Sequence, residues 1–263
     1  MNHAAFNAFM QLALGETGME DVPQVLYLTH HALNTWPQQI YPPNAGPYLV
    51  PPLSMRVIPD SRWEALPITS NERELANNII DEYKSQLVVD NAFLHSFVRS
   101  NELFAFWKRP ILLSGSHTDA QIEPGLNNRL LTGETVSSFT KRVIGWRNIR
   151  AVYGEVSSEG TLHLMLEMYG SVRDGVLYQY MLMLGDGAGG VVQSTITVKD
   201  QDAYEVGGAL TISAIQIAGP VIRVSIPYSE LSGTKTFLIS AAIYDYERSL
   251  SQTIWQSVRL PER

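Results

Sequence analysis

The second half of the chain consists of short apolar segments that alternate with turns, and this pattern is compatible with few folds. Between residues 161 and 169, for example, Leu and Met side chains occupy every second position, which is typical of a half-buried strand. Gly-containing turns follow at short intervals, and no helical periodicity separates the segments. We therefore predict an antiparallel β-sandwich over residues 146–263, of jelly-roll or immunoglobulin-like strand order. The predicted strands are 149–156, 161–169, 176–184, 191–198, 209–217, 220–226, 236–244 and 252–259.

Residues 1–109 have a different pattern, which predicts helices. Apolar residues recur at helical spacing over residues 3–14, 22–35, 69–87 and 90–107. The third of these helices begins with a capping box, because Thr69 can accept from the amide of Glu72 while the Glu72 carboxylate reaches back. Asp90 is a residue type that caps the last helix. The predicted fold class is therefore α+β, with a helical N-terminal region.

A proline-rich segment interrupts this helical region. Residues 36–67 contain eight prolines, and each proline removes an amide donor and restricts φ. Apolar residues such as Tyr48, Leu49 and Val50 lie between the prolines. We predict an extended arm that lies over its own domain or over a neighbouring subunit. Residues 110–145 are rich in turn formers and are predicted to be a junction between the two regions.

Composition excludes several classes of protein. The net charge is −7, which argues against a nucleic-acid partner, and 45% hydrophobic residues argue against disorder. The chain contains no Cys, so disulfides, thiolate zinc sites, iron–sulfur clusters and Cys nucleophiles are excluded. We predict no metal site and no cofactor. The first residues lack the features of a signal peptide, and the longest uncharged stretch contains His and Pro, so no transmembrane segment is expected. The compartment is unassigned; a soluble or a virion- or envelope-associated protein fits.

Three motifs in the second half resemble DOMON-like and family-9-carbohydrate-module-like β-sandwiches. They are the pair of segments 146–152 and 158–164, the segment 178–187 that runs into an acidic Gly-rich turn, and the segment 218–231 that ends in an Ile-Pro-x-Ser-x-Leu corner. The resemblance covers residues 146–261 and implies a two-layer sheet domain. Such domains bind sugars, haem or other proteins, or act as spacers. The acidic turn is reduced to Asp186 here, which argues against a calcium site, and no Met/His pair matches haem ligation.

The aromatic residues of the second half are the candidate binding residues. Residues two apart on a strand share a face, so two Tyr pairs can form a stripe that stacks on sugar rings or anchors a protein. If these side chains are buried, they belong to the core instead. The candidates are Tyr178, Tyr180, Tyr244, Tyr246, Trp146 and Trp255.

Catalytic motifs are few. Glu16, between Gly15 and Gly18, faintly resembles the catalytic glutamate of peptidoglycan-cleaving hydrolases, although no second carboxylate is identified. The Gly-rich segment 185–190 leads into a strand, so it predicts a hairpin turn and not a dinucleotide site. His30 and His31 are adjacent on a predicted helix and cannot clamp one metal ion. Residues 116–119 contain the residue types of a catalytic triad, but we interpret them as a hydrogen-bonded turn.

The sequence therefore favours a non-enzymatic structural or assembly protein, such as a virion or cell-envelope component. Its sandwich and extended arm would bind protein partners or further copies of the chain, because low surface charge suits subunit interfaces. A carbohydrate-binding module is the first alternative. A peptidoglycan hydrolase that uses Glu16 is the second.

Overall fold

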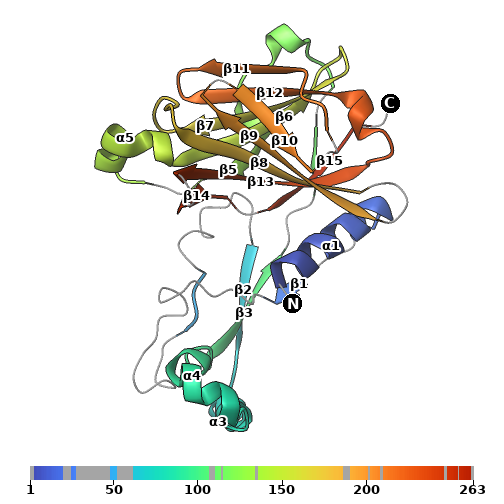
Figure 1. The fold of residues 1–263 in the computed structure, drawn as a ribbon. Helices are drawn as coiled ribbons and strands as arrows, with labels where there is room; N and C mark the ends of the chain where they lie inside the picture. Colours follow the sequence, from blue (N-terminus) through green and yellow to red (C-terminus); the bar gives the residue numbers. More distant parts are fainter. Residues whose placement is uncertain are drawn as a thin grey trace. The chain divides into compact units, whose positions relative to one another are not determined.

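The computed structural model divides the chain into two compact units (Figure 1). Unit 1 contains residues 1–22 and 109–263, and unit 2 contains residues 23–108. The N-terminal helix therefore belongs with the C-terminal strands, although the sequence grouped it with residues 1–109. The described residues are 3–19, 25–27, 48–51, 62–106, 110–113, 115–133, 136–185, 190–200, 202–207, 210–245, 248–253 and 255–261.

Unit 1 contains two sheets, and almost all of their strand pairs are antiparallel, as the pattern of the sequence predicts. The chain is thus of mixed α+β class. One sheet has the order β11(Ala214–Ala218)-β12(Val221–Pro227)-β7(Thr161–Met168)-β6(Ile149–Val156)-β5(Arg129–Thr132). The other sheet has the order β10(Asp202–Val206)-β9(Val191–Lys199)-β8(Val176–Gly185)-β13(Thr236–Asp245)-β15(Gln256–Arg259)-β4(Ile111–Leu112), and β14(Arg248–Gln252) pairs with β13. Only the β15–β4 pair is parallel among the described strands.

Most predicted strands lie within a residue or two of the observed ones, and two do not. The segment 252–259 is not one strand, since β14 ends at Gln252 and β15 begins at Gln256. The segment 209–217 becomes a strand only at Ala214, and the strand β10 before it was not predicted.

The main hydrophobic core lies between the two sheets. It contains buried residues of both, among them Leu164 and Ile222 from one sheet and Tyr180 and Phe237 from the other. The hydroxyl of Tyr180 donates to the carbonyl oxygen of Ile222 (2.7 Å), and the carbonyl oxygen of Leu164 lies 3.3 Å from it. Because this buried hydroxyl has protein partners, it joins the two sheets without an unsatisfied polar atom.

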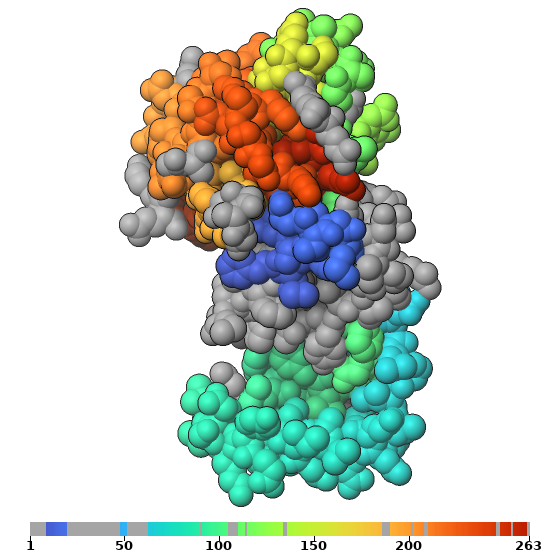
Figure 2. Space-filling model, turned by 90° about the vertical axis from the view of Figure 1, so that its right-hand side faces the viewer, coloured from blue at the N-terminus to red at the C-terminus, as the bar shows by residue number. Residues whose placement is uncertain are grey.

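On the outer face of the seven-stranded sheet, α1(His3–Glu16) covers part of β8, β13 and β15. Leu12 of this helix and Leu238 of β13 form a small buried cluster, against which Met183 and Trp255 pack. A Cβ atom on Gly15 would lie 2.5 Å from the hydroxyl oxygen of Thr236, so the helix and the strand approach closely only because residue 15 has no side chain. Figure 2 shows α1, in blue, lying against red and orange surface from the end of the chain.

The outer face of the five-stranded sheet is covered by residues 115–128, which we call the strap. The strap includes two short 3-10 helices, η2(Asp119–Gln121) and η3(Leu126–Asn128). Its Ile122 is fully buried and packs against Ala151, Tyr153 and Met165. The period-two pattern of residues 161–169 predicted a half-buried strand, and this was wrong, because the strap buries the outward side chains of β7 as well.

The predicted junction, residues 110–145, contributes to unit 1 itself. It supplies β4, the strap, β5 and the helix α5(Ser138–Ile144), and the 3-10 helix η4(Gly145–Arg147) follows. Between β5 and α5 the chain passes against β6, where a Cβ atom on Gly133 would overlap the carbonyl oxygen of Ile149. The amide of Gly133 donates to the carbonyl of Arg150 (2.8 Å). This turn can therefore lie on β6 only with glycine at position 133.

Unit 2 contains a three-stranded antiparallel sheet in the order β1(Val25–Tyr27)-β3(Asn101–Phe106)-β2(Arg62–Pro67). Two helix predictions were therefore wrong. Residues 25–27 are a strand inside the predicted helix 22–35, whose other residues lie outside the described part of the chain. Residues 101–106 are also a strand, because Phe104 and its neighbours pair with strands on both sides. Apolar spacing alone could not separate a helix from a strand here.

The predicted capping box is confirmed at the start of α3(Ser70–Asp81). The Thr69 hydroxyl accepts from the Glu72 amide (3.3 Å), and the Glu72 carboxylate accepts from the Thr69 amide (2.7 Å). The helix ends earlier than predicted, at Asp81, and α4(Lys84–His95) follows. Asp90 lies within α4 and does not cap a helix. The imidazole of buried His95 joins the two helices, since its nitrogens lie 3.0 Å from Asn77 Oδ1 and 3.2 Å from Asp81 Oδ1.

Most of the predicted arm, residues 36–67, lies outside the described part of the chain. Its last residues form β2, an edge strand, which is where proline is tolerated in a sheet. Within the arm, Leu49 makes two backbone hydrogen bonds with the side chain of Asn101. Its amide donates to Asn101 Oδ1 (2.7 Å), and its carbonyl accepts from Asn101 Nδ2 (3.2 Å). Among the described helices, none is both long and apolar enough to cross a membrane.

Candidate functional site

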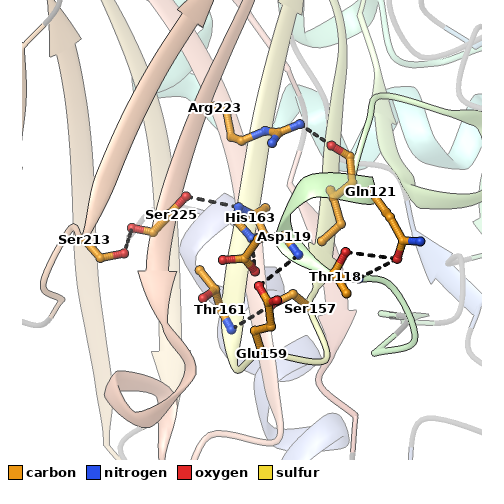
Figure 3. Close-up of polar contacts among 11 residues, drawn as sticks. Thr118, Asp119, Gln121, Ser157, Glu159, Thr161, His163, Ser213, Arg223 and Ser225 are labelled. Carbon is orange, nitrogen blue, oxygen red and sulfur yellow. Dashed lines mark hydrogen bonds and ion pairs between the residues drawn. The ribbon is translucent and has the colours of Figure 1, made fainter.

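A polar cluster lies between the strap and the five-stranded sheet (Figure 3). At its centre is His163 of β7, whose side chain is 4% exposed. Its Nε2 lies 3.0 Å from the carboxylate of Asp119 in the strap, and its Nδ1 lies 3.1 Å from the hydroxyl of Ser225 in β12. A carboxylate only accepts, so Nε2 carries the proton that is shared with Asp119, and Nδ1 forms a hydrogen bond with the Ser225 hydroxyl.

Local structure explains how these three residues meet. His163 and Ser225 are directly opposite each other in the β7–β12 ladder, so their side chains share one face of the sheet. Asp119 is the first residue of η2, and its amide donates to the Glu159 carboxylate (3.2 Å). Hydrogen bonds from Ser157 and from His163 lower the pKa of Asp119, so its carboxylate is ionised at neutral pH.

A second set of polar contacts holds the same strap. The Nδ1 of His117 lies 2.5 Å from Oε1 of Glu155, and the Asn128 amide donates to Oε2 of the same carboxylate (2.9 Å). Glu155 belongs to β6 and is buried, so each carboxylate oxygen has a partner from the strap. Arg223 of β12 donates to the carbonyl of Ile122. The turn predicted at residues 116–119 is thus rich in side-chain hydrogen bonds, and they connect it to β6 and β7.

The Ser225–His163–Asp119 chain has the connectivity of a nucleophile, a base and an orienting acid. Two features of the geometry argue against nucleophilic chemistry. Ser225 is 8% exposed, and it lies in the middle of a strand that is paired on both sides. Its neighbouring amides therefore belong to the sheet ladder and cannot form an oxyanion hole. The arrangement is better suited to fastening the strap to the sheet.

Next to this cluster, Tyr153 and Arg150 of β6 share the carboxylate of Glu167. The Tyr153 hydroxyl donates to Oε2 (2.6 Å), and the Arg150 guanidinium donates to Oε1 (2.7 Å). Burial, together with the hydrogen bond to Glu167, raises the pKa of Tyr153 to about 12. This phenol is therefore a hydrogen-bond donor and not a base at physiological pH.

Glu16, the catalytic candidate, is the last residue of α1 and is half-buried. Its Oε1 accepts from the amide of Lys235 (3.3 Å), and its side chain lies against Gly185. Both contacts are with residues at the ends of β8 and β13. The carboxylate thus closes the contact between α1 and the seven-stranded sheet, which is a structural role.

The structure contradicts an exposed aromatic stripe at Tyr178 and Tyr180. These two residues share one face of β8 as predicted, but it is the inner face, where they are 1% and 0% exposed. The Tyr178 hydroxyl accepts from the Arg173 amide (3.0 Å), and burial raises the pKa of Tyr178. Both side chains belong to the core and cannot stack on a ligand from the surface.

The other aromatic candidates do not form one surface. Trp146, in η4, is half-buried against the main core, and the Arg173 guanidinium lies 5.0 Å from its ring centroid. Trp255 packs under α1, and Tyr244 is half-buried at the end of β13. Tyr246 lies outside the described residues. Sequence spacing found pairs on a common face but could not show which face is covered.

Two cavities of unit 1 are small. One, of about 180 Å³, lies beside the strap, and the other, of about 230 Å³, lies above the Tyr178 hydroxyl. Both are below the usual range of about 300–1,000 Å³ for ligand pockets. Among the residues that the structure describes, no three His, Asp or Glu side chains are placed to hold a metal ion.

An exposed apolar row lies on the helices of unit 2. Leu75, Ile79 and Tyr83 are four residues apart, and their exposed fractions are 59%, 52% and 60%. We call these three residues the apolar row. None of the residues of α3 is buried. The spacing was visible in the sequence and predicted a helix, but spacing alone did not show that these side chains are exposed.

Comparison with known proteins found neither a family model nor a curated protein that matches this chain. The interpretation of its function therefore depends on its own geometry.

Proposed function

We propose that this chain is a non-enzymatic assembly protein that binds a protein partner through the apolar row of unit 2. The observation that carries the proposal is that Leu75, Ile79 and Tyr83 are each more than half exposed. Burial of a large apolar side chain contributes about 1.5–3 kcal/mol, so a partner that covers the row gains stability. Contiguous exposed apolar surface of this kind marks interaction sites.

In this proposal unit 1 is the scaffold. Part of the outer face of each sheet is covered from within the chain, by α1 and by the strap, and its polar cluster fastens the strap. We propose a sandwich of the DOMON-like or family-9-carbohydrate-module-like kind, of jelly-roll or immunoglobulin-like order. The β6–β7 pair and the strand β12 followed by η5(Tyr228–Leu231) lie where the motifs predict them, which supports this proposal. We propose that the protein is a component of a virion or of a cell envelope, in which this scaffold would hold the partner-binding unit.

Photo-cross-linking in the cells that make the protein tests the assembly role. A photoreactive amino acid at position 79 is expected to give a discrete cross-linked product. The same group at position 126 is the matched control, because Leu126 is 79% exposed but lies on the strap of unit 1. The variant with Leu75→Ser, made together with the cross-linker at 79, should lose the product. No product at position 79, or equal products at both positions, would refute the assembly role.

A further inference from the structure

Carboxylates lie on either side of Leu75 and Ile79, the two residues of the apolar row that belong to α3. Glu72 precedes Leu75 by three residues, and Glu82 follows Ile79 by three, so all four lie on one face of a helix. Glu82 has right-handed helical backbone angles (φ −76°, ψ −18°), so this face continues to the end of α3. Both carboxylates are exposed. The only basic residue of α3, Arg73, is half-buried and lies on the opposite side.

One of the two carboxylates, that of Glu72, is charged and has a fixed position. Hydrogen bonds with the backbone and side chain of Thr69 lower the pKa of Glu72 and hold its carboxylate at the start of the helix. A partner that covers Leu75 and Ile79 therefore meets apolar side chains that have a carboxylate on either side.

A second copy of the chain does not complement this face. In an antiparallel pair of α3 helices with Leu75 opposite Ile79, Glu72 of one copy faces Glu82 of the other. In a parallel pair in register, each carboxylate faces its own equivalent. Like charges placed opposite each other across an interface disfavour the pairing.

We propose that the apolar row binds an amphipathic helix of a partner protein in which Lys or Arg flanks the apolar residues at both ends. This inference rests on the proposed assembly role and names the chemistry of the partner. Apolar side chains supply most of the affinity, and the two ion pairs at the ends select the partner and its register.

Two labelled helical peptides test the partner class by fluorescence anisotropy with the full chain. They share the same apolar residues at i and i+4, and the flanking positions are Lys in one and Glu in the other. The Lys peptide is expected to bind about tenfold more tightly at low salt, since two exposed ion pairs replace two repulsions. The ratio should approach one at about 0.5 M salt.

Matched variants separate this site from the general negative charge of the protein. Glu82→Lys should weaken binding of the Lys peptide and strengthen binding of the Glu peptide. Glu74→Lys makes the same change of net charge about 100° around the helix from Leu75, so it should not reverse the preference. Glu72 is left unchanged because it caps α3.

Three results of the peptide experiment would overturn the basic-helix inference. They are no binding of the Lys peptide, equal binding of both peptides, and equal effects of Glu82→Lys and Glu74→Lys. A cross-link from position 79 to a second copy of the chain would also overturn it. In each of these cases a discrete cross-link at position 79 would still support the assembly role, so the two proposals fail separately.

Discussion

Ile122→Ala is expected to release the strap from the five-stranded sheet. The Ile122 side chain is fully buried and makes the apolar contact of the strap with Ala151, Tyr153 and Met165. It is also the only buried residue among positions 115–128. Its removal leaves the polar contacts of Asp119 and His117 in place, but these groups are partly exposed and can exchange their partners for water.

The magnitude follows from the volume removed. Alanine lacks three carbon atoms of isoleucine, and at about 0.8 kcal/mol per buried methylene the lost transfer free energy is about 2.4 kcal/mol. A rigid cavity would raise the cost toward 4–5 kcal/mol. The strap lies on one side of the sheet and can settle toward it, so we expect a loss of about 2–3 kcal/mol. For Leu126→Ala, 79% exposed on the same strap, we expect less than about 0.5 kcal/mol.

Amide hydrogen exchange of residues 115–128 measures this loss locally, which matters because a chain of two units need not unfold in one step. If the strap opens as a unit, 2–3 kcal/mol corresponds to exchange that is about 30–150 times faster in Ile122→Ala. Exchange in β13, in the other sheet, should change much less. Equal exchange in Ile122→Ala and Leu126→Ala would refute the view that this one side chain holds the strap.

Three further predictions concern unit 1. Gly133→Ala should destabilise the protein by about 3 kcal/mol in chemical denaturation, because the new Cβ meets the Ile149 carbonyl; Gly115→Ala, where the nearest atom lies 3.9 Å away, should be neutral. Because its pKa is raised from 10.0 to about 12, Tyr153 contributes stability that is complete below pH 10 and is lost as the pH rises through 12. Tyr153→Phe should reduce the alkaline loss in a series of unfolding curves, in which the buried Tyr178 and Tyr180 keep their own part, and an unchanged loss would contradict it. Because its folded pKa is lowered, Asp119 contributes stability above its ordinary pKa of 3.8, and this is lost as the pH falls through the folded value; strap exchange should therefore accelerate below about pH 4 in the native protein but show a weaker pH dependence in Asp119→Asn.

The sequence predicted the parts of the fold that depend on neighbours in the chain. The capping box at Thr69 and the strand 149–156 are examples, since hydrogen bonding and alternation act within a few residues. The sequence-based prediction of a helix failed at Phe104, which lies in a strand because it pairs with β1 and β2. Prediction from the sequence also failed for Tyr180, whose alternation was recognised but whose buried face depends on the other sheet.

The candidate sites were predicted less well, for a related reason. Asp119 was noticed among the residue types of a triad, but His163 and Ser225, its partners, lie on two strands that only the sheet brings together. The row at Leu75 was noticed from its spacing, but a helical spacing is the same whether a core or a partner covers it. Burial is a property of the whole fold, and a local pattern does not specify it.

The composition of unit 1 from two separate stretches of chain has a consequence for biosynthesis. Leu12 precedes Leu238 and Trp255, against which it packs, by more than 200 residues in the chain, so it is made well before them. At about 5–20 residues per second, the ribosome leaves the apolar side of α1 without its partner for tens of seconds. During that interval nascent chains on one messenger can exchange their α1 helices. A chaperone that shields residues 3–16 during synthesis would prevent such swapped products.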